Sequence, residues 1–323
     1  MVATTHLGRT GLVVSTVGLG CNNLGRAGTA SESQEGTDAL IDAALEAGIT
    51  FFDVADTYGA QPGLSEQRLG AALKGRRDDV VVATKFGMDA RGANGADFGA
   101  RGSRRYVVRA VEASLRRLGT DWIDLYQFHT PDPSTPIEET LAALDDLVRS
   151  GKVRYVGHSN FAGWQIAHAE FVGRELGTRF VSAQNHYNLL DRRAELEVAP
   201  ACETYGLGLL PYFPLANGLL TGKYRDGAPE GSRLTQTRQH LLETAQGEQL
   251  GRFHDFAVER GVTELDVAIS WLATRPAVAS VIAGATRPEQ IRANAAAASW
   301  TPSADDLAAL EEIFPGPERV ALF

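Results

Sequence analysis

Short apolar runs alternate with stretches of helical spacing along almost the whole chain. The apolar runs predict eight strands, at residues 14–20, 49–55, 80–85, 123–129, 153–159, 180–187, 208–214 and 278–285. Several of them, such as VVVATK in the third, are almost continuously apolar, which is typical of strands in a sheet covered on both faces. The pattern therefore predicts repeated βα units built on a parallel sheet.

Helical patterns follow most of these strands. They predict helices at residues 33–47, 65–73, 103–118, 137–150, 164–176, 193–205 and 288–298. Some begin at a serine suited to the N-cap position, as at Ser65 and Ser103, and others end at a glycine, as at Gly48 and Gly119. Because composition does not change along the chain, we predict one α/β domain over residues 1–323, a closed (β/α)8 TIM barrel rather than an open doubly wound sheet.

Two segments interrupt the regular spacing. Residues 87–102 are rich in glycine and alanine, and residues 221–247 form a second long insertion. Both follow predicted strands, so both are expected at the carboxyl end of the barrel, where long loops usually serve function. We predict that they form the rim of a substrate site.

Composition narrows the classes of protein. Hydrophobic residues make up 44% of the chain, enough for a large core, yet no run of about eighteen would span a membrane. The opening MVATTHLGRTG lacks the parts of a secretory signal, so a cytoplasmic location is expected. A net charge of −9 disfavours nucleic acids and anionic membranes as partners. The two cysteines, Cys21 and Cys202, are too few for a disulfide framework and are expected to be buried thiols.

Four side chains able to exchange or orient protons lie at the ends of three neighbouring predicted strands. Asp53 and Tyr58 follow ITFFDVA, Lys85 closes VVVATK, and His129 closes IDLYQFH. The carboxyl ends of parallel strands meet at one edge, so these groups are expected in one pocket. A phenol beside an ammonium, a carboxylate and an imidazole points to acid catalysis at a polar bond.

Each of the four also has a simpler interpretation. Tyr58 alone would be a packing residue, Lys85 a solvated strand end, Asp53 a turn residue and His129 a buried histidine bonded to a loop carbonyl. Together the four residues predict a proton donor with its supporting groups. A phenol with a pKa of about 10 is a poor acid until a cation lowers that value. Lys85 would be that cation, Asp53 its counter-ion, and His129 a second donor to the same substrate oxygen.

Other catalytic classes fit less well. Asp53, Asp56, His129 and His186 are metal-ligand types, but Lys85 would place a positive charge where the metal would sit, and no HExxH or HxH spacing occurs. No GxSxG motif of a serine hydrolase is present. We therefore predict no metal site.

A dinucleotide site is suggested near the last strand. Gly284 leads through Arg287 into a helix with Pro288 at its first position, a place where barrels commonly bind phosphate. The chain contains no GxGxxG motif, so a Rossmann domain is not indicated. Stacking on a nicotinamide ring and bonds to its carboxamide would come from Tyr212, Ser159, Asn160 and Gln184. A plain αβ connection and ordinary core polar residues remain the alternatives.

Six segments together resemble the aldo-keto reductase superfamily over nearly the entire chain. They are FFDVADTYG with SEQRLG (51–70), VVVATKFG (80–87), DWIDLYQFHTPDP (121–133), GKVRYVGHSNF (151–161), PYFPLANGLLTGKY (211–224) and VIAGATRPEQIRAN (281–294). The resemblance implies a (β/α)8 barrel that reduces aldehydes or ketones to alcohols by direct hydride transfer. The implied cofactor is NADPH/NADP+ in preference to NADH, and Arg287 would carry that preference.

The resemblance also implies residue roles. Tyr58 would be the general acid, Lys85 would lower its pKa, Asp53 would hold the lysine and His129 would orient the carbonyl. Cofactor contacts would come from Gly20, Cys21, Ser159, Asn160, Gln184, Tyr212, Leu215, Gly218, Lys223, Arg233, Gly284, Thr286, Arg287, Gln290 and Asn294. The chain departs from the family pattern in a longer GAQPGLSE connection, at Thr130 and at Ala293, which bear on the substrate rim and the adenine contacts.

Two rival functions remain open. The first is a cofactor-sensing regulatory subunit with slow turnover that reports redox state to a partner protein. The second, an isomerase or lyase with Lys85 as a Schiff base, is weakened by the expected pairing with Asp53. Leu24, Phe86 and Met88 suggest an apolar or aromatic aldehyde or ketone as substrate. The oligomeric state is not predicted.

Overall fold

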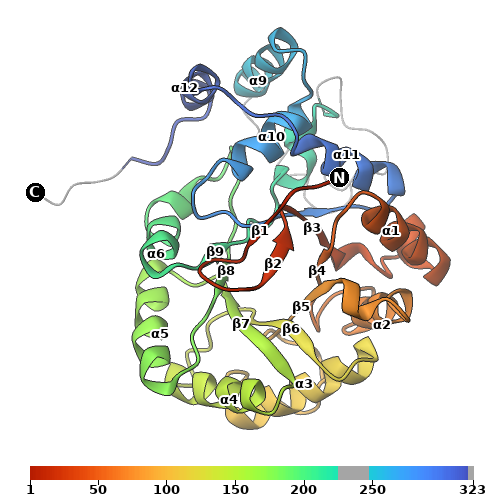
Figure 1. Ribbon diagram of the computed structural model, residues 1–323, viewed down its shortest axis with the longest axis vertical. Helices are drawn as coiled ribbons and strands as arrows, with labels where there is room; N and C mark the ends of the chain where they lie inside the picture. Colours follow the sequence, from red (N-terminus) through yellow and green to blue (C-terminus); the bar gives the residue numbers. More distant parts are fainter. Residues whose placement is uncertain (225–246, 319–323) are drawn as a thin grey trace, which may run out of the picture.

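Eight parallel strands form the central sheet of the computed structural model, which describes residues 1–224 and 247–318 (Figure 1). Their spatial order is β10-β3-β4-β5-β6-β7-β8-β9. The bounds are β3 Val17–Gly20, β4 Phe51–Asp53, β5 Val81–Phe86, β6 Ile123–Phe128, β7 Val153–Ser159, β8 Ser182–Gln184, β9 Gly208–Leu209 and β10 Val281–Gly284. All eight predicted strands are thus present, most of them shorter than expected.

The two ends of the sheet meet just before β10. Leu209 of β9 forms a parallel bridge with Val278. Its amide donates to the carbonyl of Ala277 over 2.7 Å, and its carbonyl accepts from the amide of Ala279 over 3.0 Å. The sheet closes on itself, which confirms the predicted (β/α)8 barrel.

Helices surround the strands in Figure 1. They are α1 Gln34–Glu46, α2 Leu64–Ala72, α3 Arg104–Leu118, α4 Ile137–Arg149, α5 Gly163–Leu176, α6 Val198–Tyr205, α9 Gly247–Glu259, α10 Glu264–Ala273, α11 Pro288–Ala297 and α12 Ala304–Ile313. Short 3-10 turns lie at Cys21–Asn23, Ala30–Glu32, Arg77–Asp79, Arg193–Glu195 and Ala216–Thr221. No helix of the described residues has the length and apolar character needed to cross a bilayer.

Helix α10 has no counterpart among the predicted helices, and neither do α9 and α12. Six consecutive residues of α10, from Val267 to Leu272, are buried. Because the helix is buried all round, its sequence lacks the alternation of apolar and polar positions by which an amphipathic helix is recognised. A recognisable signal was present at its start. Thr263 and Asp266 form a reciprocal capping box.

An antiparallel hairpin, β1 Thr4–His6 and β2 Val13–Ser15, precedes the barrel. The predicted strand 14–20 is therefore wrong as one element: it divides into β2 and β3. Ser15 causes the division, because its hydroxyl donates to the carbonyl of Val17 and accepts from the amides of Thr50 and Phe51. Leu7 and Val14 of this region pack with Phe51, Ala83 and Leu125 in one cluster, so the hairpin closes the amino-terminal end of the barrel.

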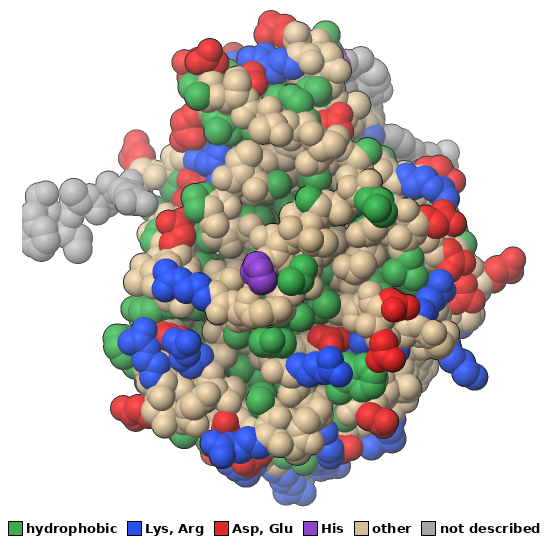
Figure 2. Space-filling model, in the orientation of Figure 1, with side chains coloured by type: hydrophobic (Ala, Val, Ile, Leu, Met, Phe, Trp, Pro, Cys, Tyr) green, Lys and Arg blue, Asp and Glu red, His purple; other side chains and the backbone are tan. Residues whose placement is uncertain are grey.

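Figure 2, in the same orientation, shows acidic and basic side chains interspersed over this face. Hydrophobic side chains are scattered among them rather than gathered in one large area. Mixed charge of this kind is ordinary for a protein surface. The face therefore gives no indication of a polyanionic partner.

His158 of β7 lies on the helix side of the sheet and is fully buried. Its ring stacks on Phe161 at 4.4 Å, and neither ring nitrogen finds a hydrogen-bond partner in the described part of the chain. Burial lowers the pKa of His158 from 6.5 to about 3. A charged form at this position is therefore strongly disfavoured.

Replacement of His158 by leucine is expected to reduce acid sensitivity. The pKa of His158 is lower in the folded state than in the unfolded state. The contribution of this group to the free energy of unfolding is therefore present above pH 6.5 and is lost as the pH drops toward 3. By pH 4.5 this group has lowered the free energy of unfolding by about 2–3 kcal/mol. Urea unfolding at pH 7 and pH 4.5 should show a smaller difference for His158→Leu than for the wild type. An equal difference in both proteins would contradict this assignment.

Candidate active site

The four residues predicted to form one site do lie together at the carboxyl end of the barrel. Asp53 is the last residue of β4, Lys85 lies near the end of β5, and His129 directly follows β6. Tyr58 stands in the turn between β4 and α2. The first three are buried and Tyr58 is partly exposed, so the phenol lies where a substrate can reach it.

Lys85 forms the centre of this group. Its Nζ donates to Asp53 Oδ2 over 2.6 Å, to the carbonyl of Val54 over 3.0 Å and to the Tyr58 hydroxyl over 3.4 Å. Burial favours the neutral amine, but the Asp53 carboxylate and the Tyr58 hydroxyl outweigh it and raise the pKa of Lys85 above its usual value. A lysine held as an ammonium is a poor nucleophile, which argues against Schiff-base chemistry.

Asp53 is held on both of its oxygens. Oδ2 accepts from Lys85, while Oδ1 accepts from Gln127 Nε2 over 3.1 Å and from Gln184 Nε2 over 2.9 Å. Gln127 of β6 was not among the predicted site residues. The signal for it was its position two residues before His129, because alternate residues of a strand share one face.

Tyr58 has its phenol beside the ammonium. The Lys85 Nζ lies 4.9 Å from the ring centroid, and the His129 ring meets the Tyr58 ring edge-on at 5.9 Å. Burial raises the pKa of Tyr58, and Lys85 opposes this without reversing it. The expected net lowering of this pKa is therefore not seen: the pKa lies above its usual value, and the Lys85 ammonium only reduces the size of the rise.

His129 is fixed through its backbone. Its amide donates to the carbonyl of Phe86 over 2.7 Å, and its carbonyl accepts from Asn160 Nδ2 over 2.9 Å. Burial, with a smaller effect of Lys85, places the pKa of His129 well below 6.5. The imidazole is neutral near pH 7 and keeps one N–H to donate.

Residues predicted to hold a carboxamide form a connected set beside the tetrad. The Tyr212 hydroxyl donates to Asn160 Oδ1 over 2.8 Å, and the Ser159 hydroxyl donates to the carbonyl of Gln184 over 2.7 Å. Asn160 adopts a φ of 62°, a left-handed conformation that asparagine tolerates better than most residues. The Tyr212 ring stacks on His186 at 5.4 Å.

A second group of predicted cofactor contacts gathers where β10 meets β3. Gly284 is paired with Gly20, Cys21 follows with its carbonyl accepting from the Ser65 hydroxyl over 2.5 Å, and exposed Arg287 stands at the N-cap of α11. Their predicted neighbours Thr286, Gln290 and Asn294 lie in the same connection and helix; the Thr286 amide donates to Gln290 Oε1 over 2.8 Å.

Leu215, Gly218 and Lys223 belong to the connection after β9. Gly218 has a φ of 101°, and the Lys223 side chain packs against it. Most of the predicted long segment 221–247, from residue 225 to residue 246, lies outside the described residues, and so does the predicted cofactor contact Arg233. The other predicted segment, 87–102, contains turns and no helix or strand.

This donor set suits a dinucleotide. The exposed Arg287 guanidinium and the positive end of the α11 dipole would hold phosphate. Ser159, Asn160 and Gln184 offer amide and hydroxyl groups next to the tetrad, where a nicotinamide would have to lie. The two halves stand at the carboxyl ends of β10 and β7, on the same side of the barrel.

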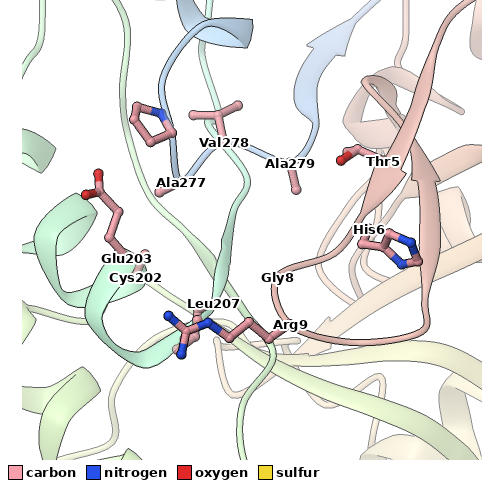
Figure 3. A pocket seen from close by; sticks show the side chains of 12 residues that line it. Thr5, His6, Gly8, Arg9, Cys202, Glu203, Leu207, Ala277, Val278 and Ala279 are labelled. Atoms are coloured by element: carbon pink, nitrogen blue, oxygen red, sulfur yellow. The ribbon is translucent and has the colours of Figure 1, made fainter.

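A separate hollow of about 290 Å³ lies at the opposite end of the barrel (Figure 3). Its lining includes Thr5 and Arg9 of the hairpin region, Glu203 at the end of α6, and the segment 276–279. These residues precede their strands or belong to the hairpin, so the hollow is at the amino-terminal end. It shares no residue with the tetrad.

Comparison with known proteins agrees with the geometry. A family model described as "Aldo/keto reductase family" matches residues 16–314. The chain is 40% identical to "Uncharacterized oxidoreductase YrpG" of Bacillus subtilis, covering 97% of this chain and 96% of that protein. It is 33% identical to "L-glyceraldehyde 3-phosphate reductase" of Escherichia coli strain K12 (95% and 91%). It is 35% identical to "Putative voltage-gated potassium channel subunit beta" of Schizosaccharomyces pombe (92% and 91%).

Proposed function

The chain belongs to the aldo/keto reductase family and is an NAD(P)H-dependent oxidoreductase, and from this premise we propose that it uses NADPH to reduce aldehydes or ketones to alcohols. Tyr58 is the general acid. The observation that carries the proposal is the buried chain of contacts from Asp53 through Lys85 Nζ to the Tyr58 hydroxyl, 2.6 Å and 3.4 Å.

Tyr58 and His129 act on the carbonyl oxygen, whereas Lys85 and Asp53 act on Tyr58. Tyr58 and neutral His129 donate hydrogen bonds to that oxygen and hold the carbonyl in place. When bound, the nicotinamide supplies the hydride that the carbonyl carbon gains. The oxygen takes the Tyr58 proton, and Lys85 stabilises the phenolate until it regains a proton from water. Asp53 keeps the ammonium charged and directed at Tyr58.

The direction of the Tyr58 pKa suits this order of events. Because burial keeps the proton on the phenol, it is not released to water before the substrate oxygen becomes basic. The adjacent Lys85 ammonium then stabilises the tyrosinate only as the proton leaves. A screen of NADPH oxidation with aldehydes, ketones, quinones and sugars tests the proposal. No carbonyl-dependent oxidation with any of them would contradict it.

Arg287→Ala is expected to weaken discrimination between the two cofactors. A guanidinium–phosphate hydrogen bond contributes about 1.5–3 kcal/mol, so the ratio of kcat/KM for NADPH over NADH should fall by about tenfold or more. Arg292→Ala is the matched control, because Arg292 is an exposed arginine of the same helix paired with Glu46. An unchanged ratio in Arg287→Ala would remove Arg287 from the cofactor site.

A second candidate function is a cofactor-sensing subunit whose slow turnover reports redox state to a partner protein. It is favoured by relatives named as potassium channel β subunits, including one of Oryza sativa at 37% identity. Single-turnover and steady-state rates separate the two functions. A hydride-transfer step much faster than cofactor release, with steady-state turnover below about one per minute on every substrate, would favour the sensor. The cytoplasmic location expected from the sequence is compatible with both.

A further inference from the structure

Asn94 is buried within a segment that is otherwise mostly exposed. It is 5% exposed, whereas Arg91, Gly92, Ala93 and Ala96 around it are exposed. The segment 87–102 follows β5 at the carboxyl end of the barrel, directly after Lys85 and Phe86. A polar residue that enters the interior from such a segment must satisfy its amide there, because an unpaired buried amide is costly.

Three side chains satisfy that amide. Asn94 Nδ2 donates to Asp56 Oδ2 over 2.6 Å and to the Tyr106 hydroxyl over 3.2 Å. Asn94 Oδ1 accepts from Arg117 Nη2 over 3.0 Å. Asp56 lies in the turn after β4, and Tyr106 and Arg117 lie on α3. One carboxamide therefore ties the segment to the two elements behind it.

The contacts continue toward the catalytic strand. Arg117 Nε donates to Glu66 Oε2 over 2.5 Å, and Glu66 Oε1 accepts from the Thr84 hydroxyl over 2.6 Å. Thr84 is the neighbour of Lys85 on β5, and Asp56 is two residues before Tyr58. Buried networks of this kind fix the geometry of all their members. The same network thus holds the segment 87–102 and the backbone on both sides of the Tyr58–Lys85 pair.

We infer that Asn94 is a positioning residue, whose buried carboxamide fixes the rim segment 87–102 against the turn that carries Tyr58. It touches no reacting atom and acts through Asp56. The inference rests on the proposed function for its kinetic consequence, although the anchoring itself does not. Neither the sequence pattern nor the family resemblance assigned a role to Asn94.

Asn94→Ala tests the anchoring independently of catalysis. The segment should become accessible to trypsin after Arg91, with the cleavage rate in native protein rising about tenfold or more over the wild type. Asp121→Ala is the control: Asp121 is exposed in the turn after α3 and precedes β6, so it lies outside the segment 87–102 and at the opposite end of the barrel from the tetrad. Equal cleavage of Asn94→Ala and wild type would overturn the inference.

The kinetic arm uses the same two variants. Loss of the anchor is expected to lower kcat/KM for the best carbonyl substrate about tenfold, since small displacements of a catalytic group are costly. The Kd for NADPH, measured by fluorescence titration, should stay within about twofold, because the predicted cofactor residues lie on other loops. A loss of NADPH affinity by the same factor as the loss of kcat/KM would assign Asn94 a general structural role and overturn the inference.

Asn94→Asp adds a readout that general loosening would not produce. The new carboxylate would face Asp56, with Glu66 from α2, Arg117 and Tyr106 from α3, Lys85 from β5 and Tyr126 from β6 also nearby. Burial and Glu66 already raise the pKa of Asp56 to about 8. Two adjacent carboxyl groups can share one proton at low pH but repel each other when both ionise.

The ratio of kcat/KM for Asn94→Asp to that of wild type should therefore be near one at pH 6 and fall about tenfold by pH 9. Trypsin sensitivity should rise over the same interval. A ratio that does not change with pH would overturn the role of the Asp56 contact. If wild type reduces no carbonyl, the proposed function fails, while the trypsin arm still decides whether Asn94 anchors the segment.

Discussion

Tyr58→Phe is expected to lower kcat for aldehyde reduction by about 10²-fold or more. The ring stays in place against Lys85 and His129, so the change removes one proton donor and little else. His129 can still hold the carbonyl oxygen through its N–H, but a neutral imidazole is a weaker acid than an imidazolium and cannot replace the phenol. Initial rates of NADPH oxidation, with substrate at saturation, measure the effect.

Two further measurements keep this result interpretable. The Kd for NADPH should stay within about twofold, because the phenol hydroxyl contacts Lys85 rather than the predicted cofactor residues. Tyr205→Phe on α6 is the matched control, since that ring packs on Phe171 far from the tetrad, and it should retain full activity. A Tyr58→Phe protein that turns over like its parent would require a different general acid.

The barrel and the tetrad were accessible from the sequence for the same reason. Parallel strands buried on both faces are apolar until they end, so a polar residue at the end of such a run stands out. Asp53, Lys85 and His129 each occupy that position. The turn after ITFFDVA added Tyr58, and the N-cap predicted at Ser103 is confirmed for α3. The N-cap predicted at Ser65 is wrong: α2 begins after Gly63, and the Ser65 hydroxyl donates to the carbonyl of Cys21 instead of capping the helix.

The supporting contacts were not accessible in this way. Gln127 looks like one polar residue in an apolar strand, and only the register between β5 and β6, in which it pairs with Lys85, directs it to Asp53. Asn94 sits in a segment with no period at all, and its partners Asp56 and Arg117 are 38 and 23 residues away. Contacts at such separations depend on the packing of whole elements, which residue patterns do not encode.

The direction of the Tyr58 pKa is the clearest case of this limit. Charge alone predicts a lowered value beside an ammonium, and the sequence reveals the charge. Burial acts in the opposite direction and is the larger effect here, because the phenol stands beside the buried side chains of Lys85 and His129. Only the three-dimensional environment decides between the two.

Lys85→Met is expected to reduce both activity and stability. Without the ammonium nothing stabilises the departing tyrosinate, so kcat should fall by about 10²- to 10⁴-fold. The Asp53 carboxylate, 2% exposed, would be left without its counter-ion. Breaking a buried ion pair in this way costs about 3–5 kcal/mol in the free energy of unfolding. Urea unfolding at pH 7 measures that loss.

Combining Lys85→Met with Asp53→Asn separates the two effects. An asparagine removes the unpaired charge and keeps an oxygen that can accept from Gln127 and Gln184, now at 3.1 Å and 2.9 Å. Most of the lost unfolding free energy should therefore return, since replacing both members of a buried pair is often nearly neutral. Activity should remain as low as in Lys85→Met, because the charge beside Tyr58 is still absent. Recovery of turnover together with stability would show that Lys85 acts only through folding and not on the phenol.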